Sequence, residues 1–471
     1  MLRSCVFAVA ALLHGAVIAD EALMSLVDRQ EKKATALADD IWRLAELGYQ
    51  ETRSTEALQA YLKRGGFSVR KGAAGIPTAF VAEAGSGSPV IGILAEFDAL
   101  PGLSQAAVAE RKPREEGGAG HACGHHLFGA ASATAGVAIA RWLKRTGQNG
   151  TVRVYGTPAE EGGSGKVYIA RAGALNGVDA VLHWHPGDRN DASPASTTAN
   201  KSGRFQFHGK AAHAAQAPDR GRSALDAVEA MNFMVNLMRE HIPDQARVHY
   251  VITDGGDAPN IVPEFAEVYY YIRHPEVAQV KTLFNRVVKI AEAAAQGTET
   301  KMTVEVMHGN YPVMPNDRLA ALVDGNMRAL GGFSYSPEEA QFAERIRKTL
   351  IGGTLPLGSQ ETVQPFEFKQ GMGSTDVGDV SWLVPTVGFR TATWVPGTPA
   401  HSWQAVAAGG MSIGHKGMML AAKVLAKTAA DIYLNPGIAQ EASQELLERR
   451  GADFRYEALL GDRQPPLDYR K

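Results

Sequence analysis

Cysteine, histidine and glutamate residues gather in short segments whose spacing suits metal-dependent chemistry. The densest segment, residues 121–126, holds one thiol and three imidazoles, with Cys123 and His125 two positions apart on a turn that contains Gly124. Thiolate and imidazole groups are ligands for zinc and similar divalent ions. A histidine-rich loop that only caps a helix is the alternative for this segment taken alone.

Two adjacent carboxylates, Glu160 and Glu161, follow a predicted strand and precede two glycines. One carboxylate of such a pair can bind a metal while its neighbour takes a proton from water, which is the division of labour that a hydrolase needs. A solvated turn is the structural alternative for this pair.

Three further histidines stand at the ends of predicted strands. His183 and His185 end one strand, where alternation directs both side chains to the same face, and His401 follows a late apolar strand. Open α/β sheets bind ligands beyond the carboxyl ends of their strands, so these histidines are expected to converge with the cysteine and the glutamates. A closed structural zinc site has four ligands, and a set of five favours two ions that share a bridging ligand.

The segments between these residues must form a scaffold of alternating strands and helices. The apolar patterns predict a helical stretch over 22–66, strands at 80–82, 90–94, 152–155, 180–182 and 385–389, and a buried helix over 127–143. Strands that alternate with helices form a mostly parallel sheet. The predicted fold class is therefore α/β.

Residues 200–310 have a different order of predicted helices and strands. Their predicted order of strand, helix, strand, strand, helix, strand (βαββαβ) is that of a small ferredoxin-like sandwich. We therefore expect this segment to be inserted between two parts of a catalytic domain, residues 20–199 and 311–435. Residues 436–471 are expected to form a charged peripheral helix and tail.

Composition excludes several classes of partner. The 48 Lys and Arg against 50 Asp and Glu give a net charge of −2 without a basic stripe, so no nucleic acid and no membrane is expected to bind. Two cysteines do not make a disulfide framework. Residues 1–19 combine an apolar run with a small-residue end, which predicts a signal peptide and a periplasmic or secreted protein. If that run is instead a buried helix, the protein is cytoplasmic.

Taken together, these segments resemble the metal-dependent amidohydrolases of the aminoacylase/carboxypeptidase family, in the branch that holds auxin-conjugate and hippurate hydrolases. The resemblance runs from about Trp42 to Asn435. Besides the segment of Cys123 and His125, it is carried by residues 47–52 (LGYQET), 95–102 (AEFDALPG), 158–163 (PAEEGG), 184–186 (WHP), 255–260 (GGDAPN), 374–379 (STDVGD) and 399–403 (PAHSW).

The resemblance implies two divalent metal ions, manganese or zinc, and a role for each candidate residue. It implies a general base, Glu160, and a set of metal ligands in which Cys123 bridges the ions and the terminal ligands are His125, Glu161, His185 and His401. One position departs from the family pattern. His126 stands where the family has Asp or Asn, so a competing ligand is expected beside His125. Asp98 is expected either to orient a ligand or to cap a strand end.

The resemblance also makes residues 200–310 a lid and dimerisation domain. It implies that His213 reaches the active site of a partner subunit, and that Asn260 and Arg273 bind a substrate carboxylate. An ordinary salt bridge for Arg273 and a plain loop role for His213 are the alternatives. The expected assembly is a homodimer, or a heterodimer with a homologous subunit.

The activity implied is metal-dependent hydrolysis of the amide bond in a small N-acyl amino acid, with an aminobenzoyl or aryl-acyl group as in p-aminobenzoyl-glutamate. Hydrolysis of another N-acyl amino acid or dipeptide, such as an auxin conjugate, is the first alternative. A thiol amidase that uses Cys123 as nucleophile and a non-catalytic metal-binding homologue are the others. Because only the first two need a metal for turnover, a chelator separates them from the thiol amidase.

Overall fold

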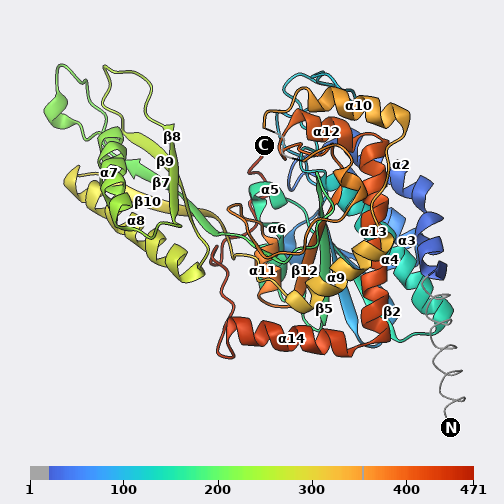
Figure 1. The fold of residues 1–471 in the computed structure, drawn as a ribbon. Helices are drawn as coiled ribbons and strands as arrows, with labels where there is room; N and C mark the ends of the chain where they lie inside the picture. Colours follow the sequence, from blue (N-terminus) through green and yellow to red (C-terminus); the bar gives the residue numbers. More distant parts are fainter. Residues whose placement is uncertain (1–20, 353–354, 471) are drawn as a thin grey trace, which may run out of the picture.

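The computed structural model describes residues 21–352 and 355–470. They form a larger α/β domain and a smaller domain that projects from its side (Figure 1). The predicted signal peptide, residues 1–19, lies outside the described residues.

The larger domain is built on a six-stranded sheet with the order β1-β2-β4-β3-β5-β12. Strands β4, β3, β5 and β12 run parallel, while β1 and β2 are antiparallel to their neighbours. The strands are β1 (Ser68–Lys71), β2 (Phe80–Ser86), β3 (Val90–Ala95), β4 (Gly150–Gly156), β5 (Ala180–Gly187) and β12 (Thr386–Ala392). Strand β3 is buried from Ile91 to Ala95, as expected of a parallel strand with both faces covered.

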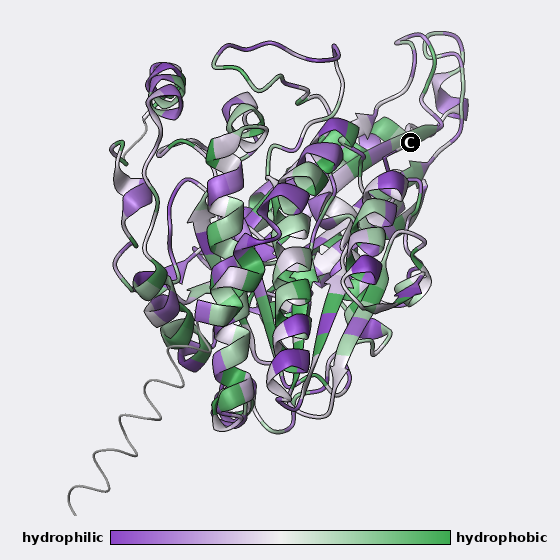
Figure 2. Cartoon of the chain, turned by 90° about the vertical axis from the view of Figure 1, so that its right-hand side faces the viewer, coloured by the Kyte–Doolittle hydropathy of each residue, from purple (hydrophilic) through white to green (hydrophobic). Residues whose placement is uncertain are grey.

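Helices α4 (His125–Thr146) and α13 (Ser412–Leu434) pack against each other and against the sheet, and α2 (Glu31–Leu44) and α3 (Thr52–Arg64) lie against α4. The small residues of α4 allow this close packing, since a Cβ on Gly136 would lie 2.6 Å from the Val154 side chain. Apolar residues accordingly concentrate on the central strands in Figure 2.

The smaller domain, called the lid below, is a four-stranded antiparallel sheet with the order β10-β7-β9-β8 and two helices on one face. Its elements are β7 (Ala199–His208), α7 (Ala224–Met238), β8 (Arg247–Asp254), β9 (Phe265–His274), α8 (Val277–Gly297) and β10 (Lys301–Asn310). A separate apolar core around Phe205, Val228 and Tyr270 holds these layers together.

The remaining elements connect or cover the two domains. They are η1 (Ala73–Gly75), α5 (Glu160–Gly163), α6 (Gly165–Arg171), β6 (Ala195–Ser196), η2 (Pro218–Arg220), η3 (Arg239–His241), α9 (Asp317–Leu330), α10 (Pro337–Arg347), η4 (Ser359–Glu361), β11 (Lys369–Gln370), α11 (Val377–Ser381), α12 (Trp403–Gly409) and α14 (Gly437–Arg450).

The predicted fold class is confirmed: a mostly parallel α/β domain carries an inserted βαββαβ domain. The helical stretch predicted over 22–66 is divided, because Ala45 adopts a left-handed conformation (φ 44°, ψ 47°) that ends α2, and α3 begins only at Thr52. Within the described residues, no helix is both long and apolar enough to cross a bilayer.

Candidate metal centre

Five candidate ligands come from different elements and meet at the carboxyl-end side of the parallel strands. Cys123 lies in the loop that leads into α4, and His125 begins that helix. Glu161 lies in α5 directly after β4, His185 lies near the end of β5, and His401 lies between β12 and α12. This is the edge of the sheet where open α/β folds bind ligands.

Backbone strain accompanies the ligands. Ala159 (φ 57°, ψ 43°) and His401 (φ 58°) adopt left-handed conformations that are unfavourable for residues with a Cβ. Gly124 (φ 73°) also needs to be glycine for space, because a Cβ there would lie 2.7 Å from the Pro186 side chain. The fold thus maintains costly conformations where side chains must be aimed at one point.

The ligand atoms form two groups that share one residue. Cys123, His125 and His185 offer atoms within 4.8 Å of one another, and so do Cys123, Glu161 and His401. The His401 Nε2 atom lies 3.0 Å from the Cys123 sulfur and 3.5 Å from Glu161 Oε1. This arrangement is suited to two adjacent ions with a thiolate between them.

Buried polar atoms that crowd together without a hydrogen bond show that the residues fit such ions. His125 Nε2, Glu96 Oε2 and Glu161 Oε1 are buried and make no hydrogen bond within the described residues, yet His125 Nε2 lies 3.0 Å from Glu96 Oε2 and Glu161 Oε1 lies 3.5 Å from His401 Nε2. Ligand atoms that lie this close and are not hydrogen-bonded fit a site that a cation completes.

Asp98 holds two of the ligands in place. Its Oδ1 atom lies 2.9 Å from His125 Nδ1, and its Oδ2 atom accepts a hydrogen bond of 2.9 Å from the Glu161 backbone N–H. With Nδ1 bound to the carboxylate, Nε2 of His125 points to the other candidate ligands and lies 3.0 Å from Glu96 Oε2, the orientation that is usual for a histidine ligand. Although burial opposes it, the positive charge of His125 lowers the pKa of Asp98.

A buried lysine compensates further carboxylates beside the site. The Lys166 ammonium group lies 2.7 Å from Glu96 Oε1 and 2.7 Å from Asp376 Oδ1. Burial disfavours its charged form, but Asp376 and Glu96 raise the pKa of Lys166. Glu96 also forms a ligand group with His125 and Glu160. The sequence prediction gave no role to Glu96, Lys166 or Asp376. Glu96 and Asp376 nevertheless lie in segments 95–102 and 374–379, which carry the resemblance to the family.

The two adjacent glutamates have opposite electrostatic environments. Burial, reinforced by the charges of Glu96 and Glu161, raises the pKa of Glu160 well above its usual range. Burial alone would also raise the pKa of Glu161, but contacts with His401 and His125 lower that pKa below its ordinary value. Carboxyl groups whose pKa values diverge in this way are suited to one proton-carrying and one charged role.

The environment of Cys123 does not suit a free nucleophile. Burial and the neighbouring Glu161 raise the pKa of the Cys123 thiol well above its ordinary value. Catalytic cysteines have a lowered pKa that keeps them as thiolates, whereas a coordinating cation deprotonates a thiol directly. This environment, together with the place of Cys123 in both ligand groups, favours the metal-ligand role over the thiol amidase.

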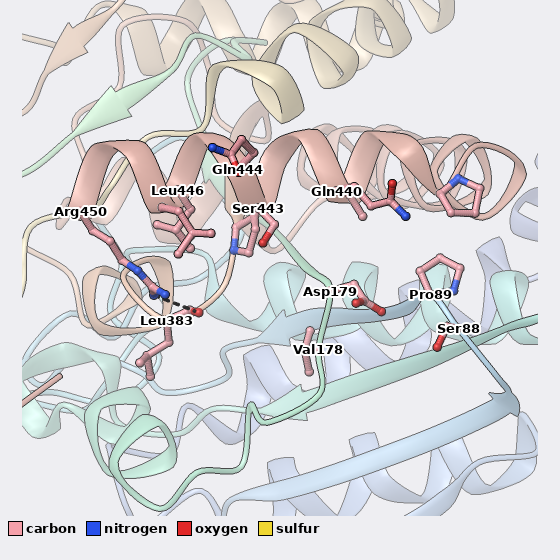
Figure 3. Close-up of a pocket in the computed structure, with 14 residues that line it drawn as sticks. Ser88, Pro89, Val178, Asp179, Leu383, Gln440, Ser443, Gln444, Leu446 and Arg450 are labelled. Carbon is pink, nitrogen blue, oxygen red and sulfur yellow. Dashed lines mark hydrogen bonds between the residues drawn. The ribbon is translucent and has the colours of Figure 1, made fainter. Parts of the chain in front are cut away.

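A cavity of about 420 Å³ opens beside these groups, with Cys123, Glu160, His185, His401 and Arg390 among its lining residues. A second cavity, of about 470 Å³, lies beneath α14 at the opposite ends of β3 and β5 (Figure 3). Among its described lining residues the charged groups are Asp179, which accepts from the Val90 N–H, and Arg450, which donates to backbone carbonyls. Of these two cavities, only the first is lined by candidate metal ligands and by Glu160.

The lid residues of the predicted site lie apart from the metal ligands of their own chain. His213 and Asn260 are exposed in adjoining loops at the far end of the lid, where the Asn260 carbonyl accepts a hydrogen bond from Ala214. Arg273 lies at the hinge end of β9, with its guanidinium 5.5 Å from the Tyr271 ring. Asn260 and Arg273 therefore flank β9 at opposite ends and do not converge within one chain. Their roles stay predictions.

His126 does not compete for metal, contrary to the expectation from its position. It is fully buried, and its Nε2 atom lies 3.0 Å from the Gly409 carbonyl oxygen. One residue along a helix turns a side chain by about 100°. His126 therefore points into the protein interior, whereas the neighbouring His125 points into the site.

The C-terminal tail, predicted as peripheral, returns to the site. Tyr469 Oη and Arg470 Nη2 both donate hydrogen bonds to the Glu161 carbonyl oxygen, at 3.1 and 2.8 Å. Helix α14 lies against α9, and the residues that follow it turn back toward the ligands. The charged composition of the tail did not predict this contact with Glu161.

Comparison with known proteins agrees with this geometry. The sequence profile described as a peptidase dimerisation domain matches residues 197–299. The chain is 41% identical to one of the subunits of the p-aminobenzoyl-glutamate hydrolase of Escherichia coli, over 89% of this chain and 93% of that protein. It is 30% identical to the Xaa-Arg dipeptidase of Mus musculus, over 89% and 90% of the two chains.

A solved structure shares the fold. A dinuclear metal-binding peptidase of the M20 family from Bacillus subtilis superimposes with a TM-score of 0.58, covering 86% of this chain and 99% of that one at 18% identity.

Asp98→Asn is expected to weaken metal binding about 10- to 100-fold, because the change removes the carboxylate that orients His125 and Glu161. Metal titration of the purified apoprotein measures this. Asp379→Asn is the matched control, since Asp379 is equally buried and accepts hydrogen bonds from Tyr311 and Tyr456 rather than from a ligand. Wild-type affinity in Asp98→Asn would show that Asp98 only caps its strand.

Proposed function

The chain belongs to the M20 family of metal-dependent hydrolases of amide bonds, and on that premise we propose that it cleaves an N-acyl amino acid of the p-aminobenzoyl-glutamate type. The observation that carries the proposal is the pair of ligand groups that share Cys123, with Glu160 beside them in one cavity. The 41% identity to part of a p-aminobenzoyl-glutamate hydrolase supports this substrate class.

The ligand set proposed for two divalent ions comprises Cys123, His125, Glu161, His185 and His401. Thiolate, imidazole and carboxylate donors together accept either manganese or zinc. When bound, the ions would acidify a water molecule and polarise the scissile carbonyl.

Glu160 is the proposed general base. Its carboxylate takes the proton of the attacking water and passes that proton to the leaving amine, so the same group acts first as base and then as acid. Its raised pKa fits the protonated half of this cycle. Asp98 and Lys166 maintain the geometry while the proton moves, because each holds neighbouring groups through buried contacts.

Dimerisation through the lid is also proposed. Strand β8 lies at an edge of the lid sheet, and apolar side chains stand exposed on it and on α7, with Val251 at 56% and Phe233 at 65%. Pairing of two such edges buries both the apolar groups and the open backbone. A homodimer is favoured, and a heterodimer with a homologous subunit is the alternative.

The assignment of the glutamate pair is tested by two isosteric variants. Glu160→Gln should retain normal metal content and lose roughly 100- to 10,000-fold in kcat, because only proton transfer is removed. Glu161→Gln should lose metal affinity. Metal analysis and kinetics of both proteins, with p-aminobenzoyl-glutamate as substrate, measure these effects. If Glu160→Gln is the metal-depleted variant, the assignment is reversed.

The role of His213 in a partner's site is tested by subunit mixing. Glu160→Gln and His213→Ala should each be almost inactive, yet co-refolding them should restore about a quarter of wild-type activity, because about half of the dimers are hybrids with one complete site. A mixture that stays inactive, while light scattering shows dimers and mass spectrometry shows subunit exchange, would place His213 outside the composite site.

A further inference from the structure

Two cations of the metal-site cavity, Lys369 and Arg390, differ in their partners. Lys369 pairs with Asp191. Arg390, by contrast, makes no side-chain hydrogen bond or ion pair within residues 21–352 and 355–470. The charge of Arg390 is therefore available to a ligand.

The sheet register places Arg390 on the same face of the sheet as the candidate ligand His185. Arg390 on β12 is the parallel partner of His185 on β5, and paired residues of neighbouring strands share a face of the sheet. Its alkyl chain runs beside Gly187, where a Cβ would be only 3.5 Å from the nearest of its carbon atoms. Arg390 and His185 also line the same cavity.

We propose that Arg390 is the receptor for the side-chain carboxylate of an acidic amino acid in the substrate. A guanidinium offers a planar fork that matches a carboxylate, and the cavity places this fork in the same subunit as the ligands. Arg273, the predicted receptor of the α-carboxylate, lies at the lid hinge and does not line this cavity. Two cations at separate places suit a substrate with two carboxylates, as in an N-acyl glutamate.

The test compares p-aminobenzoyl-glutamate with p-aminobenzoyl-glutamine, in which the side-chain carboxylate is an amide. Wild type should prefer the glutamate compound by roughly 10- to 100-fold in kcat/KM. Arg390→Gln should abolish the preference by slowing only the glutamate compound, and Arg390→Lys should restore part of it. Arg189→Gln is the matched control, because Arg189 is already paired with Asp188. An undiminished preference in Arg390→Gln overturns the proposal.

This inference rests on the proposed function, and a binding measurement separates the two. If wild type cleaves neither compound, calorimetric titration of p-aminobenzoyl-glutamate into metal-loaded Glu160→Gln and Glu160→Gln/Arg390→Gln still tests Arg390. If the double variant binds p-aminobenzoyl-glutamate about 10-fold or more weakly than Glu160→Gln, Arg390 is a carboxylate receptor. The enzyme then hydrolyses a different substrate from the one proposed. Equal affinities overturn it.

A second inference comes independently from the C-terminal tail. The tail contacts the lid before it reaches the site: Arg463 donates to the Met307 carbonyl at 2.7 Å and pairs with Glu305 at 2.6 Å, both on β10. It ends on the Glu161 carbonyl, which Tyr469 and Arg470 hold. Glu161 itself has a non-helical backbone (φ −70°, ψ 64°), so the geometry of α5 does not fix that carbonyl.

We infer that Tyr469 and Arg470 are positioning residues for the ligand Glu161. The two donors fix the carbonyl from outside, and the ring of Tyr469 packs edge-on against Tyr49 at 5.6 Å between centroids. Tyr49 in turn donates a hydrogen bond of 2.6 Å to the Gly163 carbonyl in the same turn. The tail thereby completes the support of a turn that the catalytic domain leaves partly open.

Metal titration of the apoprotein tests this role apart from turnover. Tyr469→Phe/Arg470→Ala should bind metal about 10-fold more weakly, and Arg470→Lys should lose less. Arg455→Ala is the control, because its exposed side chain in the same tail donates to the adjacent Phe454 carbonyl, away from the site. Unchanged metal affinity in the double variant overturns the inference, whatever its thermal stability.

Discussion

The charge balance of a buried acidic cluster is the constraint on which the rest of the site depends. Glu96 and Glu161 line the cavity, Asp98 contacts the Glu161 backbone, and Asp376 shares Lys166 with Glu96. Removing carboxylates from water is unfavourable unless positive charge goes with them. Lys166 and His125 supply part of that charge through contacts with Glu96, Asp98 and Asp376, and a cation bound at the candidate ligands would supply the remainder. A cation bound at these residues would therefore stabilise the folded region.

The sheet turns this electrostatic requirement into a defined geometry. Parallel strands bring successive loops to one edge, so ligands far apart in the chain meet without long connections. Left-handed residues such as Ala159 and His401 then aim the side chains. Such conformations persist only because the strands and helices around them are rigid, which explains why the ligands stand at the ends of buried elements.

The lid and the tail extend the site beyond one domain. The lid has its own apolar core and meets the catalytic domain at the hinge end of its strands, where Arg273 and the contacts of Arg463 lie. Its far loops, with His213 and Asn260, are remote from the ligands of the same chain. The roles proposed for His213 and Asn260 therefore depend on a second subunit.

The sequence alone determined the element types, because helical and strand periodicities are properties of neighbouring residues. It also indicated the candidate ligands, since a thiol, paired carboxylates and histidines stand in short segments beside predicted strands and a buried helix. The tertiary structure decided which groups meet: Lys166 with Asp376 across 210 residues, Arg470 with Glu161 across 309, and His125 rather than His126 facing the site. These choices depend on burial and on long-range charge pairing, which arise only when distant segments pack together.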